Sequence, residues 1–182
     1  MNHLMIDTET LGTGPNSVVL EIAAVQFDLS GRTGERWSKR INVQHSQDLG
    51  MEIEIDTVAW WINNHHEVFL DLVNNCGHLD PKWVMNDLRQ FINSIRPEGK
   101  FFVWSYYPAF DMCKLNNYFK KTNTIKPWAH NEEFDFATVV MGPLGPEEIP
   151  WPSEAKHTAE ADCNLQIQVL CEVLSGIDSG LL

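Results

Sequence analysis

The chain has 182 residues, of which 43% are apolar and 21% are charged, and this is enough to bury the core of one domain of ordinary size. Its 25 acidic and 13 basic side chains give a formal net charge of −12, which excludes a broadly basic surface for gripping a phosphate backbone. An anionic substrate would need a local attractor, and the surplus carboxylates allow either bound divalent cations or simply a soluble, self-repelling surface.

The N-terminal part of the sequence predicts strands. An apolar run at residues 4–6 ends at an acid, and a β-branched run at residues 17–27 follows after a turn that contains glycine and proline. This order is typical of two antiparallel strands joined by a turn. A third strand is predicted over residues 37–43.

The middle of the sequence predicts a helix followed by a buried strand. Asp80 before Pro81 is typical of an N-cap with proline at the first helical position. Apolar residues then repeat at helical spacing, at Val84, Leu88, Phe91, Ile92 and Ile95. A short run of aromatic and β-branched residues at 100–105 predicts a strand directly after this helix.

The C-terminal part predicts a long loop and a last helix. Residues 142–152 are dense in proline and glycine, which favours one loop. Leu165 and Val169 then share one stripe of a helix, which we expect over residues 158–174, before Gly176 ends it.

The domain organisation follows from the absence of any division in the sequence. There is no repeat, low-complexity tract or linker, so we expect a single domain at residues 1–176 and a short C-terminal tail at residues 177–182. Because strands and helices alternate along the chain, the fold class is predicted to be α/β, with a mixed β-sheet flanked by helices.

The cysteines and the apolar segments bear on the compartment. The four cysteines lie far apart without a Cys-x-x-Cys pair, which favours reduced thiols over a structural zinc site. The N-terminus has no basic start and no long apolar stretch, so a secretory signal is not expected. No apolar segment is long enough to span a membrane without interruption. We therefore expect a soluble protein of the cytoplasm, or of the host cytoplasm if the chain is viral.

Asp7 and Glu9, separated by Thr8, stand at alternate positions where the first predicted strand ends. If the strand continues, both carboxylates point to one face of the sheet. Neighbouring carboxylates raise each other's pKa, and a divalent cation between them reverses the sign of the interaction. Taken alone, the triplet is better explained as a solvated strand end, because short motifs of this kind often arise by chance. A metal site therefore requires further carboxylates.

Two later acids are aligned with apolar helix faces. Asp111 would open a helix with Leu115 and Tyr118 on its own face, although an ordinary N-terminal acid interacting with the helix dipole gives the same pattern. Asp162 precedes Leu165 by three residues on the buried side of the last helix, where an unpaired carboxylate is expensive. A salt bridge is the usual solution. Few basic residues lie nearby in sequence, and a metal ion shared with the first two acids meets the same need.

His157 is the candidate general base. It precedes Asp162 by five residues, about 140° around an ordinary helix, so we expect it on the approach to the last helix. An imidazole there has an unperturbed pKa near neutrality, which suits a base acting on a metal-bound water. A surface histidine in a loop is the alternative. That interpretation also covers the histidines for which the sequence shows no supporting partner, namely His3, His45, His65, His66, His78 and His130.

Taken together, Asp7-Thr8-Glu9, Asp111 and residues 157–162 resemble, in order and spacing, the three exonuclease motifs of the DEDDh nucleases, a branch of the DnaQ-like 3′-5′ exonuclease family. The resemblance covers most of the chain and implies a ribonuclease H-like fold. It also implies two divalent metal ions, Mg²⁺ or Mn²⁺, and hydrolysis of phosphodiester bonds at the 3′ end of DNA or RNA with release of nucleoside 5′-monophosphates.

One segment departs from this family pattern, and another indicates a subgroup. The second motif of the family usually offers an asparagine or similar residue shortly before its aspartate, whereas this chain has the aromatic-rich residues 104–110. Residues 57–61 resemble the subgroup that contains small phage exonucleases and the nuclease module of exonuclease VIII.

The resemblance implies a role for each matched residue. Asp7 would bridge both metals, Glu9 and Asp162 would complete the first metal site, and Asp111 would hold the second. His157 would deprotonate the attacking water. In the two-metal scheme, ions about 4 Å apart stabilise the attacking and leaving oxygens of an in-line displacement. They also nearly neutralise the four acids, so an acidic protein can still cleave a polyanion.

The expected partner is the 3′ end of a nucleic acid. Backbone groups of the segment after the first acid would place it, because glycine permits close approach, and an apolar side chain would pack against the terminal base. The predicted substrate contacts are Thr8, Thr10, Leu11, Gly12 and Phe110. Large aromatics such as Trp60, Trp61 and Trp104 are interpreted as core rather than as base-stacking ligands.

Other functions remain open at this point. A catalytically silent nucleic-acid-binding or interaction module would keep the same fold, although the complete set of four acids and one histidine argues against it. An aspartic protease would need a second Asp-Thr-Gly, which is absent. A cysteine hydrolase that pairs Cys113 or Cys163 with His157 is a weaker alternative. The sequence leaves the preference for DNA or RNA, strandedness and oligomeric state open.

Overall fold

The computed structural model describes residues 1–144 and 157–178. A five-stranded mixed sheet lies at its centre, with the strand order β3-β2-β1-β4-β5. The antiparallel strands are β1 (His3–Thr10), β2 (Val19–Phe27) and β3 (Thr33–Arg40). The strands β4 (Phe102–Ser105) and β5 (Glu133–Asp135) continue the sheet in parallel beside β1.

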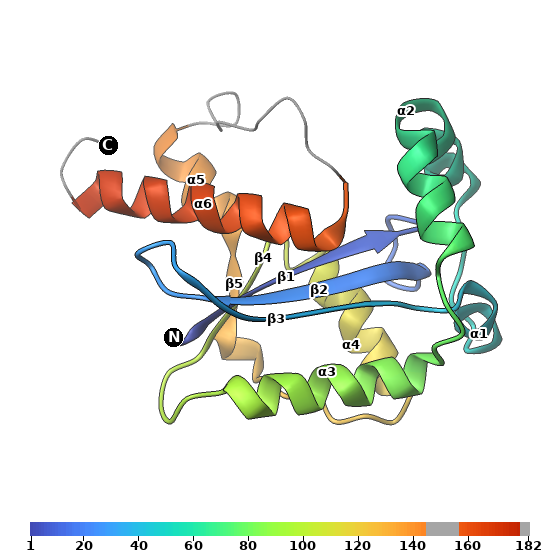
Figure 1. Cartoon of the computed structure of the whole chain (residues 1–182), viewed down its shortest axis with the longest axis horizontal. Coiled ribbons are helices and arrows are strands. Elements are labelled where there is room, and N and C mark those ends of the chain that lie inside the picture. The colour runs from blue at the N-terminus through green and yellow to red at the C-terminus, as the bar shows by residue number, and fades with distance from the viewer. Residues whose placement is uncertain (145–156, 179–182) are drawn as a thin grey trace.

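Helices cover both faces of this sheet. They are α1 (Val43–Asp48), α2 (Ile55–Asn74), α3 (Pro81–Ile95), α4 (Asp111–Lys121), α5 (Phe136–Leu144) and α6 (Ala159–Asp178), with a short 3-10 turn at His130–Glu132. In Figure 1, α5 and α6 lie on one face and α3 and α4 on the other, while α2 stands at the end of the sheet where β1 ends and α6 begins. The predicted α/β class with a mixed sheet flanked by helices is confirmed.

The alternation of side chains along β1 builds two separate cores. Leu4 and Ile6 pack on the α3 and α4 side, whereas Met5 packs on the α5 and α6 side. Because both faces are covered, a central strand reads as a nearly continuous apolar run, as β2 does. The same alternation sends Asp7 and Glu9 toward α6 and Thr8 toward α4.

The third strand differs from its prediction over residues 37–43. The strand β3 begins earlier, at Thr33, and ends at Arg40. The reason is local, because the side chain of Asn42 accepts a hydrogen bond from the His45 backbone N–H and thereby caps α1. Val43 consequently starts a helix instead of ending a strand.

The predicted helices are present, but some of their predicted ends were wrong. The Asp80 side chain accepts from the Lys82 N–H and caps α3, as expected. The last helix continues through Gly176, so the expected stop there was wrong. A glycine inside a helix costs only about 1 kcal/mol relative to alanine, which packing easily offsets. The loop expected over residues 142–152 was also wrong at its start, since α5 runs to Leu144, and its remainder lies outside the described residues.

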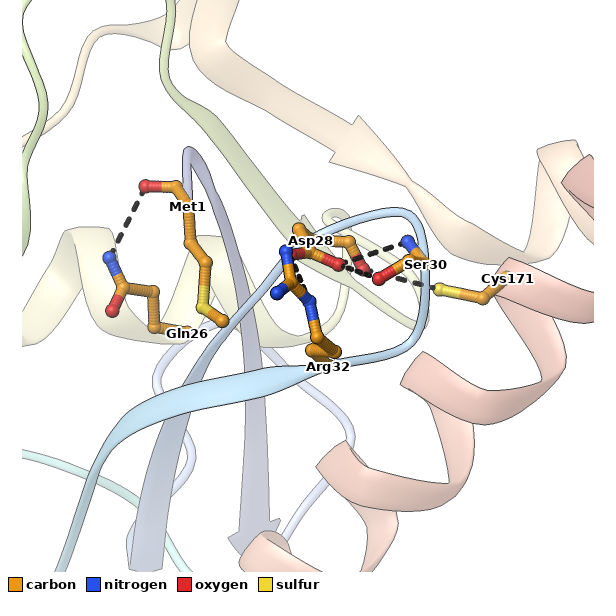
Figure 2. A network of polar contacts seen from close by, with 6 residues as sticks. All are labelled: Met1, Gln26, Asp28, Ser30, Arg32 and Cys171. Carbon is orange, nitrogen blue, oxygen red and sulfur yellow. Dashed lines mark hydrogen bonds and ion pairs between the residues drawn. The ribbon is translucent and has the colours of Figure 1, made fainter.

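The hairpin between β2 and β3 is tied to the last helix, as Figure 2 shows. The carboxylate of Asp28 accepts from Ser30 and pairs with Arg32 at 2.7 Å, and these contacts hold its pKa at about 2. Cys171 on α6 donates its thiol to the Asp28 carbonyl at 3.7 Å. The contact helps to fix α6, which carries Asp162, against the sheet.

All four cysteines are free, in agreement with the expectation of reduced thiols. None of the helices in the described parts of the chain combines the length and apolarity needed to cross a bilayer.

Candidate active site

The strand β1 places the first two acids. It continues through Asp7 and Glu9 to Thr10, so both carboxylates lie on the face that α6 covers. Glu9 stands directly opposite Glu21 on β2. Like charges at such a position repel each other, and Arg40 on β3 relieves part of this through its ion pair with Glu21 at 3.1 Å.

The helix α6 adds the third acid. Asp162 lies in its first turn, and single oxygen atoms of Asp7, Glu9 and Asp162 all lie within 4.8 Å of one another. Within the described parts of the chain, no lysine or arginine forms an ion pair with any of these three carboxylates. Grouped oxygens without a cationic side chain are the ligands that hard divalent cations prefer.

The fourth acid approaches from the other side of β1. Asp111 is the first residue of α4, and its Oδ1 accepts a hydrogen bond from the Thr8 hydroxyl at 2.6 Å. Asp111 is not part of the group of three oxygens, but its charge is the second largest cause of the raised pKa of Asp7. The geometry thus divides the four acids into three that converge and one that flanks them.

The electrostatics of the four acids agree with this placement. Burial, followed by the charges of the neighbouring acids, raises the pKa of Asp7 and of Glu9 well above the usual range. Burial also raises the pKa of Asp111 to about 6, although the hydrogen bond from Thr8 opposes the change. The pKa of Asp162 rises to about 6, through burial and the charge of Glu21. Without a cation, the cluster therefore retains protons that isolated acids would release.

Two buried oxygens show that these residues suit a bound cation. Glu9 Oε1 and Gln166 Oε1 have no hydrogen-bond partner among the described residues. Buried acceptors of this kind are costly unless something binds them. The carboxylates of Asp7, Glu9 and Asp162 are hard oxygen donors, and a divalent ion fits them better than any side chain present.

The predicted base stands beside the acids. His157 lies just before α6 and adopts a left-handed backbone conformation, with φ 44°. It lines a cavity of about 400 Å³ together with the four acids, and burial lowers its pKa below the usual value. Its ring packs against rings of α2, at centroid distances of 5.9 Å to Trp60, 6.3 Å to Trp61 and 3.7 Å to His65.

The predicted substrate contacts surround an adjoining cavity of about 570 Å³. Four of the five line it, namely Thr8, Thr10, Gly12 and Phe110. The fifth, Leu11, is only 3% exposed and packs into the core, so the structure does not bring its side chain to either cavity. The two cavities share Thr8, Glu9 and Phe110 as walls.

The loop after β1 is held by one carboxylate. Glu54 accepts from the backbone N–H groups of Thr13 and Gly14, at 3.0 and 2.9 Å, and these bonds hold its pKa at about 2. A Cβ at Gly12 would lie 2.4 Å from Ser17 Oγ, closer than real contacts allow. A side chain at position 12 would therefore force Ser17 and Glu54 to shift from the contacts that hold this loop.

The three tryptophans divide between core and site. Trp61 and Trp104 are buried, as expected, and Trp61 donates its indole N–H to the Thr10 carbonyl at 2.9 Å. The core interpretation was wrong for Trp60, which is 44% exposed and lines the larger cavity.

Sequence reasoning missed three residues of the site. Gln166 donates from Nε2 to Asp7 Oδ1 at 2.8 Å, and its position four residues after Asp162 was the available signal, since such pairs share a helix face. Glu21 accepts from the Ala159 N–H at the start of α6, and an acid inside an apolar strand was its signal. For His65, no signal in the sequence distinguished it from its neighbours.

The comparisons with known proteins bear on this site. A family model described as a 3′-5′ exoribonuclease Rv2179c-like domain matches residues 2–174. The chain belongs to this family. The description of this Rv2179c-like family thus confirms the prediction that the chain is a 3′-5′ exonuclease. None of the curated proteins matches the sequence significantly.

Solved structures of ExoI from E. coli in complex with single-stranded DNA are similar to the Rv2179c-like domain. The zinc-bound form has a TM-score of 0.60 and 17% identity over 95% of this chain and 40% of that chain. The metal-free form has a TM-score of 0.53 and 17% identity over 93% and 38%, respectively. The chain thus spans about two fifths of the length of the ExoI chains, and the likeness confirms the ribonuclease H-like fold.

Proposed function

We propose that this Rv2179c-like domain is a metal-dependent 3′-5′ exonuclease that hydrolyses the terminal phosphodiester bond of a nucleic acid and releases nucleoside 5′-monophosphates. The observation that carries the proposal is the convergence of Asp7, Glu9 and Asp162 within 4.8 Å in a largely buried cluster without a cationic side chain. The description of the family to which the chain belongs names the same 3′-to-5′ direction of digestion.

The four acids and His157 would have different roles. Asp7, Glu9 and Asp162 would hold a first divalent ion, and Asp7 with Asp111 a second, Mg²⁺ or Mn²⁺ in each case. Two such ions supply charge stabilisation for the attacking and leaving oxygens of the displacement. His157 would accept the proton of the attacking water, and the lowered pKa keeps its imidazole in the neutral form that a base requires.

The larger cavity would receive the terminal nucleotide. Phe110 offers a ring for stacking, and the loop at Gly12 permits close approach of the backbone. Because the chain has a formal net charge of −12, binding would depend on contacts at this end rather than along an extended basic track. The family description favours RNA as the first substrate to test, and the ExoI complexes make single-stranded DNA the second.

The membership of the DEDDh branch rests on the same residues. His157 precedes Asp162 at the spacing of the histidine-type motif, and both line one cavity. The closer resemblance to the phage and exonuclease VIII subgroup rests on residues 57–61 and is likewise a proposal.

The test is a set of product ladders from 5′-labelled single- and double-stranded DNA and RNA, each with Mg²⁺, Mn²⁺ or EDTA. The native protein is compared with Asp7→Ala and His157→Ala. We expect shortening from the 3′ end that EDTA and Asp7→Ala abolish and His157→Ala reduces by roughly 10²–10⁴-fold, the usual contribution of general-base catalysis. Well-folded protein that shortens none of these substrates would contradict the proposal and favour a silent binding module.

A further inference from the structure

The contacts of the candidate base with the described part of the chain are made by rings. Among the described residues, the His157 imidazole has no hydrogen bond or ion pair, and it shares its cavity with the four acids. Its contacts are the two edge-on tryptophans at 5.9 and 6.3 Å and the tilted ring of His65 at 3.7 Å. Among the described residues, the ring contacts that orient this imidazole therefore come from α2.

Of these three contacts, the ring of His65 lies closest. Trp61, His65 and Phe69 follow one another at helical spacing on one stripe of α2, with Trp61 6.2 Å from His65 and 6.0 Å from Phe69. At His65 itself, the backbone leaves the helical conformation, with φ −143° and ψ 44°. The helix α2 is thus kinked at the residue that touches the candidate base.

A side-chain hydrogen bond lies next to the kink. The side chain of Asn64 donates to the Trp60 carbonyl at 2.8 Å, one turn earlier in α2. Asn86 in α3 makes the same bond to the Lys82 carbonyl without a kink, so this bond alone does not explain the departure at His65.

The stripe on α2 is anchored to the strand that carries the acids. Trp61 donates to the Thr10 carbonyl at the end of β1, and Asp7 and Glu9 lie on the same strand. A continuous set of contacts therefore runs from the acids through Trp61 and His65 to His157. The position of the His157 imidazole relative to the acids depends on this set of contacts.

We infer that His65 is a positioning residue, whose ring holds the His157 imidazole at the reaction centre by packing. The inference rests on the proposed function, because it presumes that His157 acts as the base. His65 is not a ligand in this account, since the oxygens that converge belong to Asp7, Glu9 and Asp162. The ring contact carries the inference, because neither imidazole has a hydrogen bond among the described residues.

The experiment compares four proteins on the substrate that the native chain degrades fastest, at saturating Mn²⁺. They are the native protein, His65→Ala, His65→Phe and the control His66→Ala. His66 is the exposed neighbour of His65 on the same helix, so its loss removes an imidazole from α2 without touching His157. Circular dichroism and thermal melting establish that each variant is folded.

We expect His65→Ala to lower kcat by roughly 10- to 100-fold with less than a twofold change in KM, because a misplaced catalytic group costs turnover rather than binding. His65→Phe, which keeps a flat ring, should stay within about threefold of the native kcat. His66→Ala should match the native protein. A native kcat in His65→Ala would overturn the inference, as would a loss in His65→Phe as large as in His65→Ala.

A second measurement does not depend on turnover. With ¹³C-labelled histidine, the ring resonances of His157, assigned by their absence in His157→Ala, should shift in His65→Ala and stay in place in His66→Ala. Unchanged His157 resonances in His65→Ala would overturn the contact itself. If the native protein degrades no substrate while these resonances do shift, the proposed function fails and the ring contact stands, so the two failures are distinguishable.

Discussion

Buried polar side chains around the four acids show how single residues shape the candidate site. Asp7 carries a hydrogen bond from Gln166, and Asp111 carries one from Thr8. Each donor occupies one oxygen of its carboxylate. The positions of Asp7 and Glu9 follow from strand alternation, which acts over two residues, and were therefore predictable. Gln166 was not identified, because its role depends on how α6 lies against β1.

Gln166 gives a prediction at the same scale. Gln166→Leu removes the amide that orients Asp7, and loss of such supporting partners commonly costs 10- to 100-fold in metal affinity. We expect a decrease of roughly that size in the affinity for Mn²⁺, measured by isothermal titration calorimetry. Gln168→Leu is the matched control, because Gln168 lies on the same helix, is exposed and bonds only to Glu172 in the described residues. Equal Mn²⁺ affinities in both variants would contradict this role.

At the scale of elements, local signals decided some boundaries and not others. The start of α3 was predicted because its cap, Asp80, and its proline act within one turn. The end of α6 was not, because a glycine inside a helix costs only about 1 kcal/mol and does not by itself end the helix. Likewise, the cap at Asn42 shortened β3, a competition between strand and helix that β-branched composition does not reveal.

A prediction at the scale of elements concerns the stability of the loop between β1 and β2. In Gly12→Ala, the new Cβ would meet Ser17 Oγ at 2.4 Å and Glu54 Cδ at 2.8 Å. We expect a loss of about 1–3 kcal/mol in the free energy of unfolding, the usual cost of overpacking, measured by urea denaturation. Gly142→Ala in α5 meets nothing within 4 Å and should be neutral or stabilising. A Gly12→Ala protein as stable as the native one would show that the loop adapts freely.

At the scale of the whole molecule, the acidic cluster that would bind metal lowers the stability of the folded protein when its carboxylates are charged. Asp7, Glu9, Asp111 and Asp162 come from three separate elements, and folding brings their charges together in a buried place. The pKa of each is raised above its usual value, so the folded protein holds protons that the unfolded chain releases. Stability from this source is full below pH 4 and declines as the pH rises through about 6.

The resulting prediction concerns pH and metal together. In EDTA, the free energy of unfolding should fall between pH 5 and 7.5, and Asp111→Asn should reduce that fall while its amide oxygen still accepts from Thr8. The stability lost by pH 7.5 is on the order of a few kcal/mol for a fully buried acid whose pKa is raised by about two units. Asp28 and Glu54, whose pKa values are about 2, oppose this trend only at low pH. His3, His65 and His157, whose pKa values burial lowers, oppose it within the window itself, so the decisive comparison is between the native protein and Asp111→Asn.

Thermal melting from pH 5 to 7.5, with EDTA or Mn²⁺, measures both effects. Mn²⁺ should raise the melting temperature of the native protein at pH 7.5 and raise that of Asp111→Asn less. A pH dependence in EDTA that is the same in the native protein and in Asp111→Asn, or a native melting temperature that Mn²⁺ leaves unchanged, would refute the charge-cluster account.

The sequence by itself determined the features that depend on neighbours along the chain. These are the alternation that puts Asp7 and Glu9 on one face, the cap of α3, the helix that opens at Asp111 and the α/β class. Only the tertiary structure decided that three carboxylates meet within 4.8 Å and that His65 touches His157. Such meetings depend on how helices pack on the sheet, and packing is set by the fit of many distant side chains at once, which no local spacing encodes.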